Sequence, residues 1–146
     1  MKKIAAHEMR YQGDKVSSDL EVTNYGDPYF EEYRDIYNDC FRAMRTALGL
    51  DPDCCGTREQ LLQKRSDIFL LLKDGEMIGS VAIYGNEIDD LIVSGKYQGR
   101  GYGKQLLLYA VNYLQSNGKG PISLHVADWN KVAVQLYLNN GFQFVD

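Results

Sequence analysis

The feature that most constrains this chain is a glycine-spaced turn between an apolar, strand-like segment and a helix. Leu91-Ile92-Val93 leads into the turn, and glycines stand at the alternate positions Gly99, Gly101 and Gly103. Glycine adopts backbone conformations that other residues avoid and lets a ligand approach the backbone closely. Amides at the start of a helix point outward and form an anion site. Arg100 and Lys104 add positive charge, so the turn suits a pyrophosphate.

Two common nucleotide motifs do not fit this turn. A Walker loop requires Gly-x-x-x-x-Gly-Lys-Ser/Thr, but Gly103-Lys104 is followed by Gln105 and position 98 is not glycine. A Rossmann turn requires Gly-x-Gly-x-x-Gly, and the glycines here lack that spacing. A glycine-rich turn without any ligand stays open as an alternative.

Composition narrows the classes of function. The chain has 146 residues and a net charge of −4. One domain is expected at this length, and the charge disfavours a nucleic-acid partner but is compatible with a cationic amine substrate. No apolar run approaches the ~20 residues of a membrane span. Residues 1–8 are basic without a long apolar stretch, so we expect no signal peptide and a cytoplasmic location.

Three cysteines make up an odd set, which argues against a disulfide framework. Cys54 and Cys55 are adjacent, Cys40 stands apart, and His7 and His125 are distant in the sequence. A metal site would need more ligands at ligand spacing. We expect free thiols and no metal.

Alternating strand-like and helix-like stretches predict a mixed α/β domain. Extended segments are expected at 3–11, 16–24, 68–72, 77–84, 87–93, 121–126 and 142–145. Helices are expected from Asp27-Pro28 to Gly49, from Thr57 to about Lys64, over 101–117 and over 130–140. Asp27 should be the N-cap of the first helix, and Thr57-Arg58-Glu59-Gln60 resembles a capping box. The segments between 68 and 93 predict an antiparallel meander. The strands that end at Val93 and Val126 flank a helix, so they should lie parallel.

Two separated patterns resemble one family. Gln98-Gly99-Arg100-Gly101-Tyr102-Gly103 is similar to the Gln/Arg-x-x-Gly-x-Gly/Ala signature of the GNAT N-acetyltransferase superfamily. Further along, Asn130, Ala133, Leu136-Tyr137 and Gly141-Phe142 match a second family pattern. The match is strong over about residues 77–144. It implies the α+β fold of this family, a mixed and mostly antiparallel sheet with one splayed parallel strand pair and flanking helices.

The resemblance implies an N-acetyltransferase that moves an acetyl group from acetyl-coenzyme A to a primary amine by direct attack within a ternary complex. The acceptor would be an amine-bearing small molecule or a protein amine. Residues 91–93 (Leu91, Ile92, Val93) would pair with the cofactor arm, and the amides of Gly99, Arg100, Gly101, Tyr102, Gly103 and Lys104 would hold the pyrophosphate. Gln98 opens the signature, and Asn130 matches the Asn that contacts the cofactor arm, although it also stands where the last helix needs an N-cap.

The resemblance also supplies catalytic candidates. Tyr137 matches the tyrosine that protonates the coenzyme A sulfur, and its alternative role is a core aromatic. Glu87 stands where the protein-acetylating branch carries its glutamate base, and its alternative role is a solvated carboxylate. Asp89 shares the strand face of Glu87 and is a rival, whereas Asp90 should point the other way.

The two ends of the chain depart from the family. The sequence carries about 18 residues before the family's usual first strand, expected at 20–23, and stops at Asp146, where the family continues with a hairpin and a seventh strand. We expect one domain over 1–146 in which this amino-terminal extension fills the place of the missing strand. The alternative is an exposed edge that pairs with a second copy of the chain.

Two other functions remain open at this stage. A GNAT-like module that binds acyl-coenzyme A as a sensor would keep the glycine turn without needing Tyr137 or Glu87. A nucleotide-binding protein would bind ATP or NAD instead.

Overall fold

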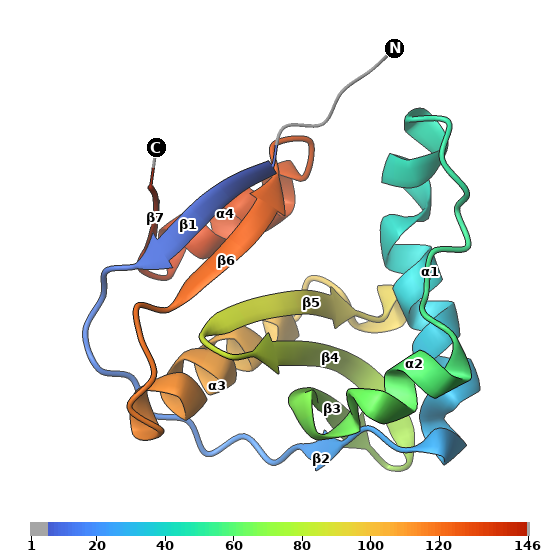
Figure 1. The fold of residues 1–146 in the computed structure, drawn as a ribbon, viewed down its shortest axis with the longest axis horizontal. Helices are drawn as coiled ribbons and strands as arrows, with labels where there is room; N and C mark the ends of the chain where they lie inside the picture. Colours follow the sequence, from blue (N-terminus) through green and yellow to red (C-terminus); the bar gives the residue numbers. More distant parts are fainter. Residues whose placement is uncertain (1–5, 146) are drawn as a thin grey trace.

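One mixed sheet forms the centre of the molecule in the computed structural model, which describes residues 6–145. Seven strands hydrogen-bond in the order β2-β3-β4-β5-β6-β1-β7, with β5 and β6 parallel and every other neighbouring pair antiparallel (Figure 1). The strands are β1 (Ala6–Tyr11), β2 (Thr23–Asn24), β3 (Ile68–Lys73), β4 (Glu76–Tyr84), β5 (Glu87–Val93), β6 (Ser123–Ala127) and β7 (Phe142–Phe144). The predicted α+β fold with a mixed, mostly antiparallel sheet and flanking helices is confirmed.

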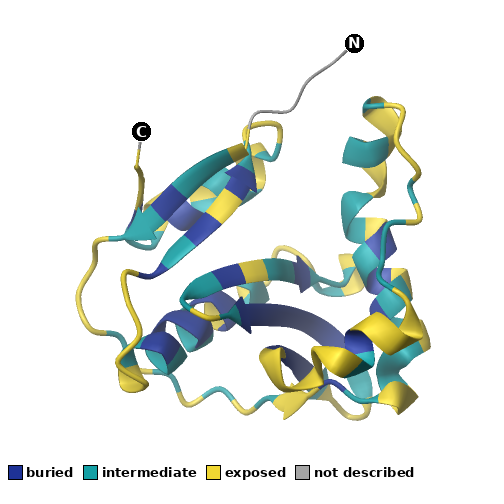
Figure 2. Cartoon of the chain, in the orientation of Figure 1, coloured by how far each residue is buried: buried dark blue, intermediate teal, exposed yellow. Residues whose placement is uncertain are grey.

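Helices cover both faces of this sheet. They are α1 (Phe30–Ala47), α2 (Arg58–Gln63), α3 (Tyr102–Ser116) and α4 (Lys131–Asn139), with short 3₁₀ turns η1 (Asp27–Tyr29), η2 (Arg65–Asp67) and η3 (Gly95–Tyr97). The apolar stripes of α1 and α2 pack on one side against residues such as Leu70 and Ile92. Those of α3 and α4 pack on the other side against residues such as Val81 and Leu124 (Figure 2). Burial of these stripes supplies the main driving force for the fold.

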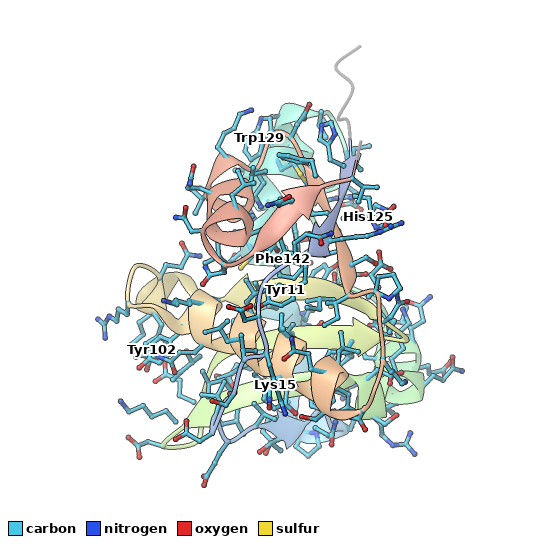
Figure 3. All side chains as sticks on the ribbon, turned by 90° about the vertical axis from the view of Figure 1, so that its left-hand side faces the viewer. Tyr11, Lys15, Tyr102, His125, Trp129 and Phe142 are labelled. Atoms are coloured by element: carbon cyan, nitrogen blue, oxygen red, sulfur yellow. The ribbon has the colours of Figure 1, made fainter. Side chains whose placement is uncertain are left out.

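β1 lies inside the sheet, between β6 and β7. Met9 is fully buried there and stands opposite Leu124 on β6 and Phe144 on β7. Tyr11 packs edge-on against Phe142, with the ring centroids 5.3 Å apart (Figure 3). The segment after β1 then passes α3, where the side-chain amide of Asn112 donates to the carbonyl of Val16, before the chain reaches β2 at the other edge of the sheet.

The parallel pair β5–β6 is short and then opens. Only Glu87–Ser123 and Ile88–Leu124 are paired, after which the two strands diverge (Figure 1). The predicted parallel arrangement is therefore confirmed over two residue pairs. The divergence leaves the backbone edges of both strands free to meet a ligand.

β5 contains a β-bulge in its antiparallel pairing with β4. Ser80 stands opposite Ile92 but Ala82 stands opposite Asp89, so β5 carries one extra residue, and Asp90 has a φ of +46°. Such an insertion turns the next side chains to the other face. The alternation of faces that the sequence predicts for Asp89 and Asp90 is consequently wrong: both line one cavity.

Several predicted boundaries shift. The first helix begins with the 3₁₀ turn η1, and Asp27 forms an ion pair with Arg58 at 3.0 Å instead of capping it. Within the segment 16–24 only Thr23–Asn24 forms a strand. Of the family's first strand, expected at 20–23, only Thr23 is therefore in a strand. Of the segment 3–11, the residues before Ala6 lie outside the described part. The capping box at Thr57 is confirmed.

Truncating Met9 tests whether β1 is a structural strand of the sheet. Met9→Ala should lower the free energy of unfolding by about 2 to 5 kcal/mol, since it removes a fully buried side chain and leaves a cavity. Urea unfolding followed by circular dichroism measures the change. Lys15→Ala, in the exposed segment after β1, is the control and should cost less than about 0.5 kcal/mol. Equal effects of the two substitutions would show that β1 contributes little.

Candidate functional site

Two clefts meet where β5 and β6 part. One, of about 520 Å³, is lined by β5, the glycine turn and α4, and the other, of about 300 Å³, is lined by α1, β5, β6 and α4. They share five lining residues, namely Phe41, Leu91, Asn130, Ala133 and Tyr137. We call the first the turn cleft and the second the α1 cavity. These shared residues place the two clefts side by side.

The glycine turn borders the turn cleft as the sequence predicts. Gly99 and Gly101 have φ of +79° and +87°, the left-handed region that favours glycine. Within the described residues no side chain caps the N-terminus of α3, and its first turn contains no acidic residue. Its leading N–H groups therefore remain available to an anion.

The predicted cofactor-binding residues divide around this cleft. All of them line it except Arg100, whose guanidinium lies 5.6 Å from the centroid of the Tyr97 ring. The lining members are Leu91, Ile92, Val93, Gln98, Gly99, Gly101, Tyr102, Gly103, Lys104 and Asn130.

The carbonyl of Val93 is held by two side chains. The Gln98 amide donates to it at 3.0 Å, and the Cys40 thiol donates to it at 3.3 Å. This contact gives Gln98 a visible role, since it ties the start of the turn to the end of β5. It also occupies a backbone acceptor that the sequence assigned to a cofactor arm.

Asn130 and Tyr137 lie at the border of the two clefts. The Asn130 side chain accepts from the Ala133 amide at 3.2 Å, which makes it the N-cap of α4. Tyr137 is 8% exposed and packs against Phe142, so it is also a core aromatic. Burial, and then the charge of Asp89, raises the pKa of the Tyr137 hydroxyl to about 12. The hydroxyl therefore keeps its proton at neutral pH.

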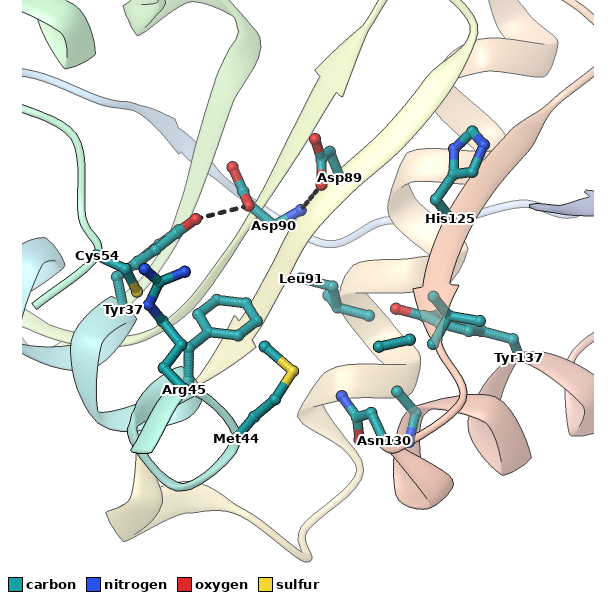
Figure 4. A pocket seen from close by; sticks show the side chains of 14 residues that line it. Tyr37, Met44, Arg45, Cys54, Asp89, Asp90, Leu91, His125, Asn130 and Tyr137 are labelled. Atoms are coloured by element: carbon teal, nitrogen blue, oxygen red, sulfur yellow. Dashed lines mark hydrogen bonds between the residues drawn. The ribbon is translucent and has the colours of Figure 1, made fainter. Parts of the chain in front are cut away.

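Asp89 and Asp90 are adjacent carboxylates in the wall of the α1 cavity (Figure 4). The Tyr37 hydroxyl on α1 donates to Asp90 at 3.2 Å, and the Asp90 amide donates to the Asp89 carboxylate at 2.8 Å. Burial, and then the charge of Asp89, raises the pKa of Asp90 to about 6 against the opposing effect of the Tyr37 hydrogen bond. The sequence identified Asp89 as a rival base, but it predicted the wrong direction for Asp90 and so did not bring the two consecutive aspartates to one site.

Glu87 does not line either cleft. Its carboxylate is bound to Nδ1 of His125 on β6, across the start of the parallel pair. His125 does line the α1 cavity, so the carboxylate orients an imidazole at the site and does not itself face it. The structure thus brings Tyr137, Asp89 and Asp90 together and leaves Glu87 behind His125.

Three further features of the described residues concern metal binding, the cysteines and membrane spans. Between positions 6 and 145 no group of three or more histidine, cysteine or acidic side chains could hold a metal ion. The three cysteines are free, and burial raises the pKa of Cys55 to about 11. None of the helices there is long and apolar enough to cross a membrane.

Comparison with known sequences places this site in context. The family model described as the acetyltransferase (GNAT) family matches residues 30–142, which include both clefts. A curated relative, the mycothiol acetyltransferase of Thermobifida fusca, is 36% identical over 72 residues, which are 49% of this chain and 20% of that protein. The chain therefore matches about a fifth of the length of that relative.

Solved structures share the fold. The PaiA N-acetyltransferase of Thermoplasma acidophilum, solved with coenzyme A, has a TM-score of 0.65 at 20% identity, over 84% of this chain and 89% of that one. A GNAT-family acetyltransferase structure from Novosphingobium aromaticivorans has a TM-score of 0.67 at 17% identity, over 97% of this chain and 60% of that one. A mutant protein of Bacillus halodurans has a TM-score of 0.74 at 13% identity, over 87% of this chain and 95% of that one. At these identities the likeness establishes the fold.

The pKa of Asp90 has a consequence for stability. The native carboxyl ionises near pH 6, above the usual value of 3.8, so the unfolded state releases its proton first as the pH rises. The contribution of this carboxyl to the free energy of unfolding is therefore fully present below about pH 4. It is lost as the pH rises from about 4 to 6. Asp90→Asn should avoid this loss and raise the free energy of unfolding at pH 8 by on the order of 3 kcal/mol, with little change at pH 4.

Urea unfolding at both pH values measures this difference. The control Asp35→Asn removes an exposed carboxylate paired with Arg34 and should change stability by less than about 1 kcal/mol at either pH. An Asp90→Asn variant that is no more stable than the parent at pH 8 would contradict the raised pKa.

Proposed function

The chain belongs to the GNAT acetyltransferase family, and on this premise we propose that it transfers an acetyl group from acetyl-coenzyme A to a primary amine within a ternary complex. One observation carries the proposal: the turn cleft and the α1 cavity adjoin at Tyr137 where β5 and β6 diverge. The turn cleft would hold the acyl donor and the α1 cavity the amine. Direct transfer requires this adjacency, because the two reactants must meet in one site.

The turn cleft fits the diphosphate and pantetheine parts of the donor. Uncapped N–H groups at the start of α3, the left-handed Gly99 and Gly101, and the Lys104 ammonium favour the diphosphate. Leu91 at the opened edge of β5 would pair with the amides of the pantetheine arm, as an added strand does. When bound, acetyl-coenzyme A supplies the activated acetyl thioester.

Two groups at the border would manage the protons. Asp90 accepts a proton from the acceptor's ammonium, since its pKa of about 6 leaves it ionised but basic at neutral pH. The neutral amine then attacks the thioester carbonyl, the carbon–sulfur bond breaks, and Tyr137 donates its hydroxyl proton to the leaving sulfur. The proton that the nitrogen loses as the amide forms restores the Tyr137 hydroxyl, and Asp90 releases its proton to solvent. We assign the base to Asp90 in place of Glu87 because the Glu87 carboxylate is bound to His125 outside both clefts.

We propose further that residues 6–145 form one domain in which β1 takes the sheet position of the family's last strand. Its pairing with β6 on one side and β7 on the other supports this assignment. In that position β1 holds β6, and therefore one wall of the α1 cavity, in place.

Acetyl-coenzyme A binding should depend on the glycine turn. Gly101→Ala places a side chain at a φ of +87°, which strains the turn, so the dissociation constant for acetyl-coenzyme A should rise by about tenfold or more. Isothermal calorimetry measures it. Gly75→Ala introduces matched strain at a φ of +76° in the β3–β4 turn and should leave the affinity unchanged. If the parent protein gives no binding heat with acetyl-coenzyme A or coenzyme A, the proposal fails.

Catalysis should separate into an acid and a base. Tyr137→Phe keeps the ring but removes the donated proton, so kcat should fall by about 10²-fold or more while the affinity for acetyl-coenzyme A stays the same. Asp90→Asn should remove the rise of kcat/KM with pH near 6. Release of coenzyme A with a panel of amines, measured between pH 5 and 9, gives both results.

The control for the first variant is Tyr113→Phe, whose ring lies on α3 against Phe69, away from both clefts. It should behave as the parent protein. Tight binding of acetyl-coenzyme A with no turnover of any amine would favour the sensor function over the enzyme.

A further inference from the structure

We propose that the acceptor carries an anionic group, such as a carboxylate, on the carbon beside its amine, and that Arg45 binds this group. The acceptor is thus of amino-acid type. This inference rests on the proposed function, since it concerns the ligand of the α1 cavity. It goes beyond that function by assigning a substrate class and a specificity residue.

Arg45 is held at the cavity by its own fold. It lies in the last turn of α1, is half-buried, and its Nε donates to the carbonyl of Asp51 in the loop after the helix. This bond fixes the guanidinium while leaving its two terminal amino groups for another partner. A fork fixed in this way loses less entropy when it binds a carboxylate.

The charge of Arg45 is unpaired in the described part of the chain. Three other arginines of this region each form an ion pair with an aspartate, namely Arg34 with Asp35, Arg42 with Asp39 and Arg58 with Asp27. Arg45 forms no ion pair within residues 6–145, although it lines a cavity that contains two aspartates. A purely structural role for Arg45 at the end of α1 would explain the hydrogen bond from its Nε to Asp51. It would not explain why a guanidinium that lines the cavity has no ion-pair partner there.

The cavity therefore carries opposite charges on separate walls. Asp89 and Asp90 come from β5, whereas Arg45 comes from α1, beside Tyr37 and Cys54 (Figure 4). Burial raises the pKa of the Cys54 thiol and the charge of Arg45 opposes this effect, in keeping with the place of both residues in the cavity lining. The other basic side chain of the wall, His125, is bound to the Glu87 carboxylate.

This pattern selects among amines. An ammonium beside the aspartates and a carboxylate on the Arg45 fork would satisfy both walls, and a volume of about 300 Å³ accommodates a molecule of amino-acid size. A diamine would bring a second ammonium toward Arg45 and be repelled. A simple amine would leave the guanidinium unpaired in a half-buried site, which costs affinity.

Calorimetry on the full chain saturated with coenzyme A tests the proposal. The probes are L-leucine, L-phenylalanine, L-glutamate, L-lysine and aminomethylphosphonate, each compared with the amine that lacks its α-carboxylate or phosphonate. At least one anionic probe should bind about tenfold or more tightly than its matched amine. The phosphonate member shows whether the Arg45 fork prefers a phosphonate to a carboxylate.

Variants of one helix supply the controls. In Arg45→Gln the preference for the anionic probe should disappear, whereas Arg45→Lys should keep part of it, because the charge remains but the fork is lost. Arg42→Gln, three residues earlier and paired with Asp39 outside the cavity, should keep it in full. An unchanged melting temperature and an unchanged affinity for coenzyme A show that the variants are folded.

The outcomes distinguish the two proposals. Matched amines that bind as well as the anionic probes, no binding of any probe, or an Arg45→Gln variant that retains the preference would each overturn the inference about Arg45. Acetylation of amines without regard to an anionic group would do the same and leave the acetyltransferase intact. Arg45-dependent binding without acetyl transfer would support the site and refute the proposed reaction.

Discussion

The divergence of β5 and β6 is the constraint on which the rest of the structure depends. Two residue pairs join the strands. Beyond Ile88 and Leu124 the edges of β5 and β6 that face each other are not paired with each other. Unpaired backbone edges inside a sheet are costly unless another group satisfies them. Here the gap is bordered by the glycine turn, by α4 and by the end of α1, and both clefts exist because these elements stop short of filling it.

Charge within this gap depends on local geometry more than on composition. The bulge brings Asp90 to the same wall as Asp89, and the resulting repulsion and burial keep one of the two carboxyls protonated to a higher pH. The Tyr37 hydroxyl partly offsets this effect by donating to Asp90. The Tyr137 hydroxyl responds in the same sense, because burial, and then the charge of Asp89, make its proton harder to remove.

Much of this arrangement could be predicted from the sequence, because it depends on short-range patterns. Apolar periodicity located the strands β3 to β6 and the helices α1, α3 and α4 within a few residues, and Thr57 and Asn130 cap helices as expected. The strand–helix–strand order fixed the parallel pair. Glycine spacing located the turn. The bulge was not predictable, because residues on either side of the extra residue in β5 still read as one strand in the sequence. Only the faces to which the later side chains point are changed. Arg45 was missed for a similar reason, since a cation in the last turn of a helix is ordinary until the loop that holds it is seen.

The position of β1 joins the two ends of the chain in one piece of structure. Of the strands in this domain β1 is made before the others, yet its neighbours β6 and β7 are the last of them to be made. Closing so long a loop is entropically costly and slows folding. Until β6 has been made, the Met9 strand has no native partner, and the gap that forms the site lacks one of its supports. Assembly of the reactive centre is therefore among the final events of folding, and a nascent chain interrupted before β6 would present an unsatisfied edge that invites aggregation.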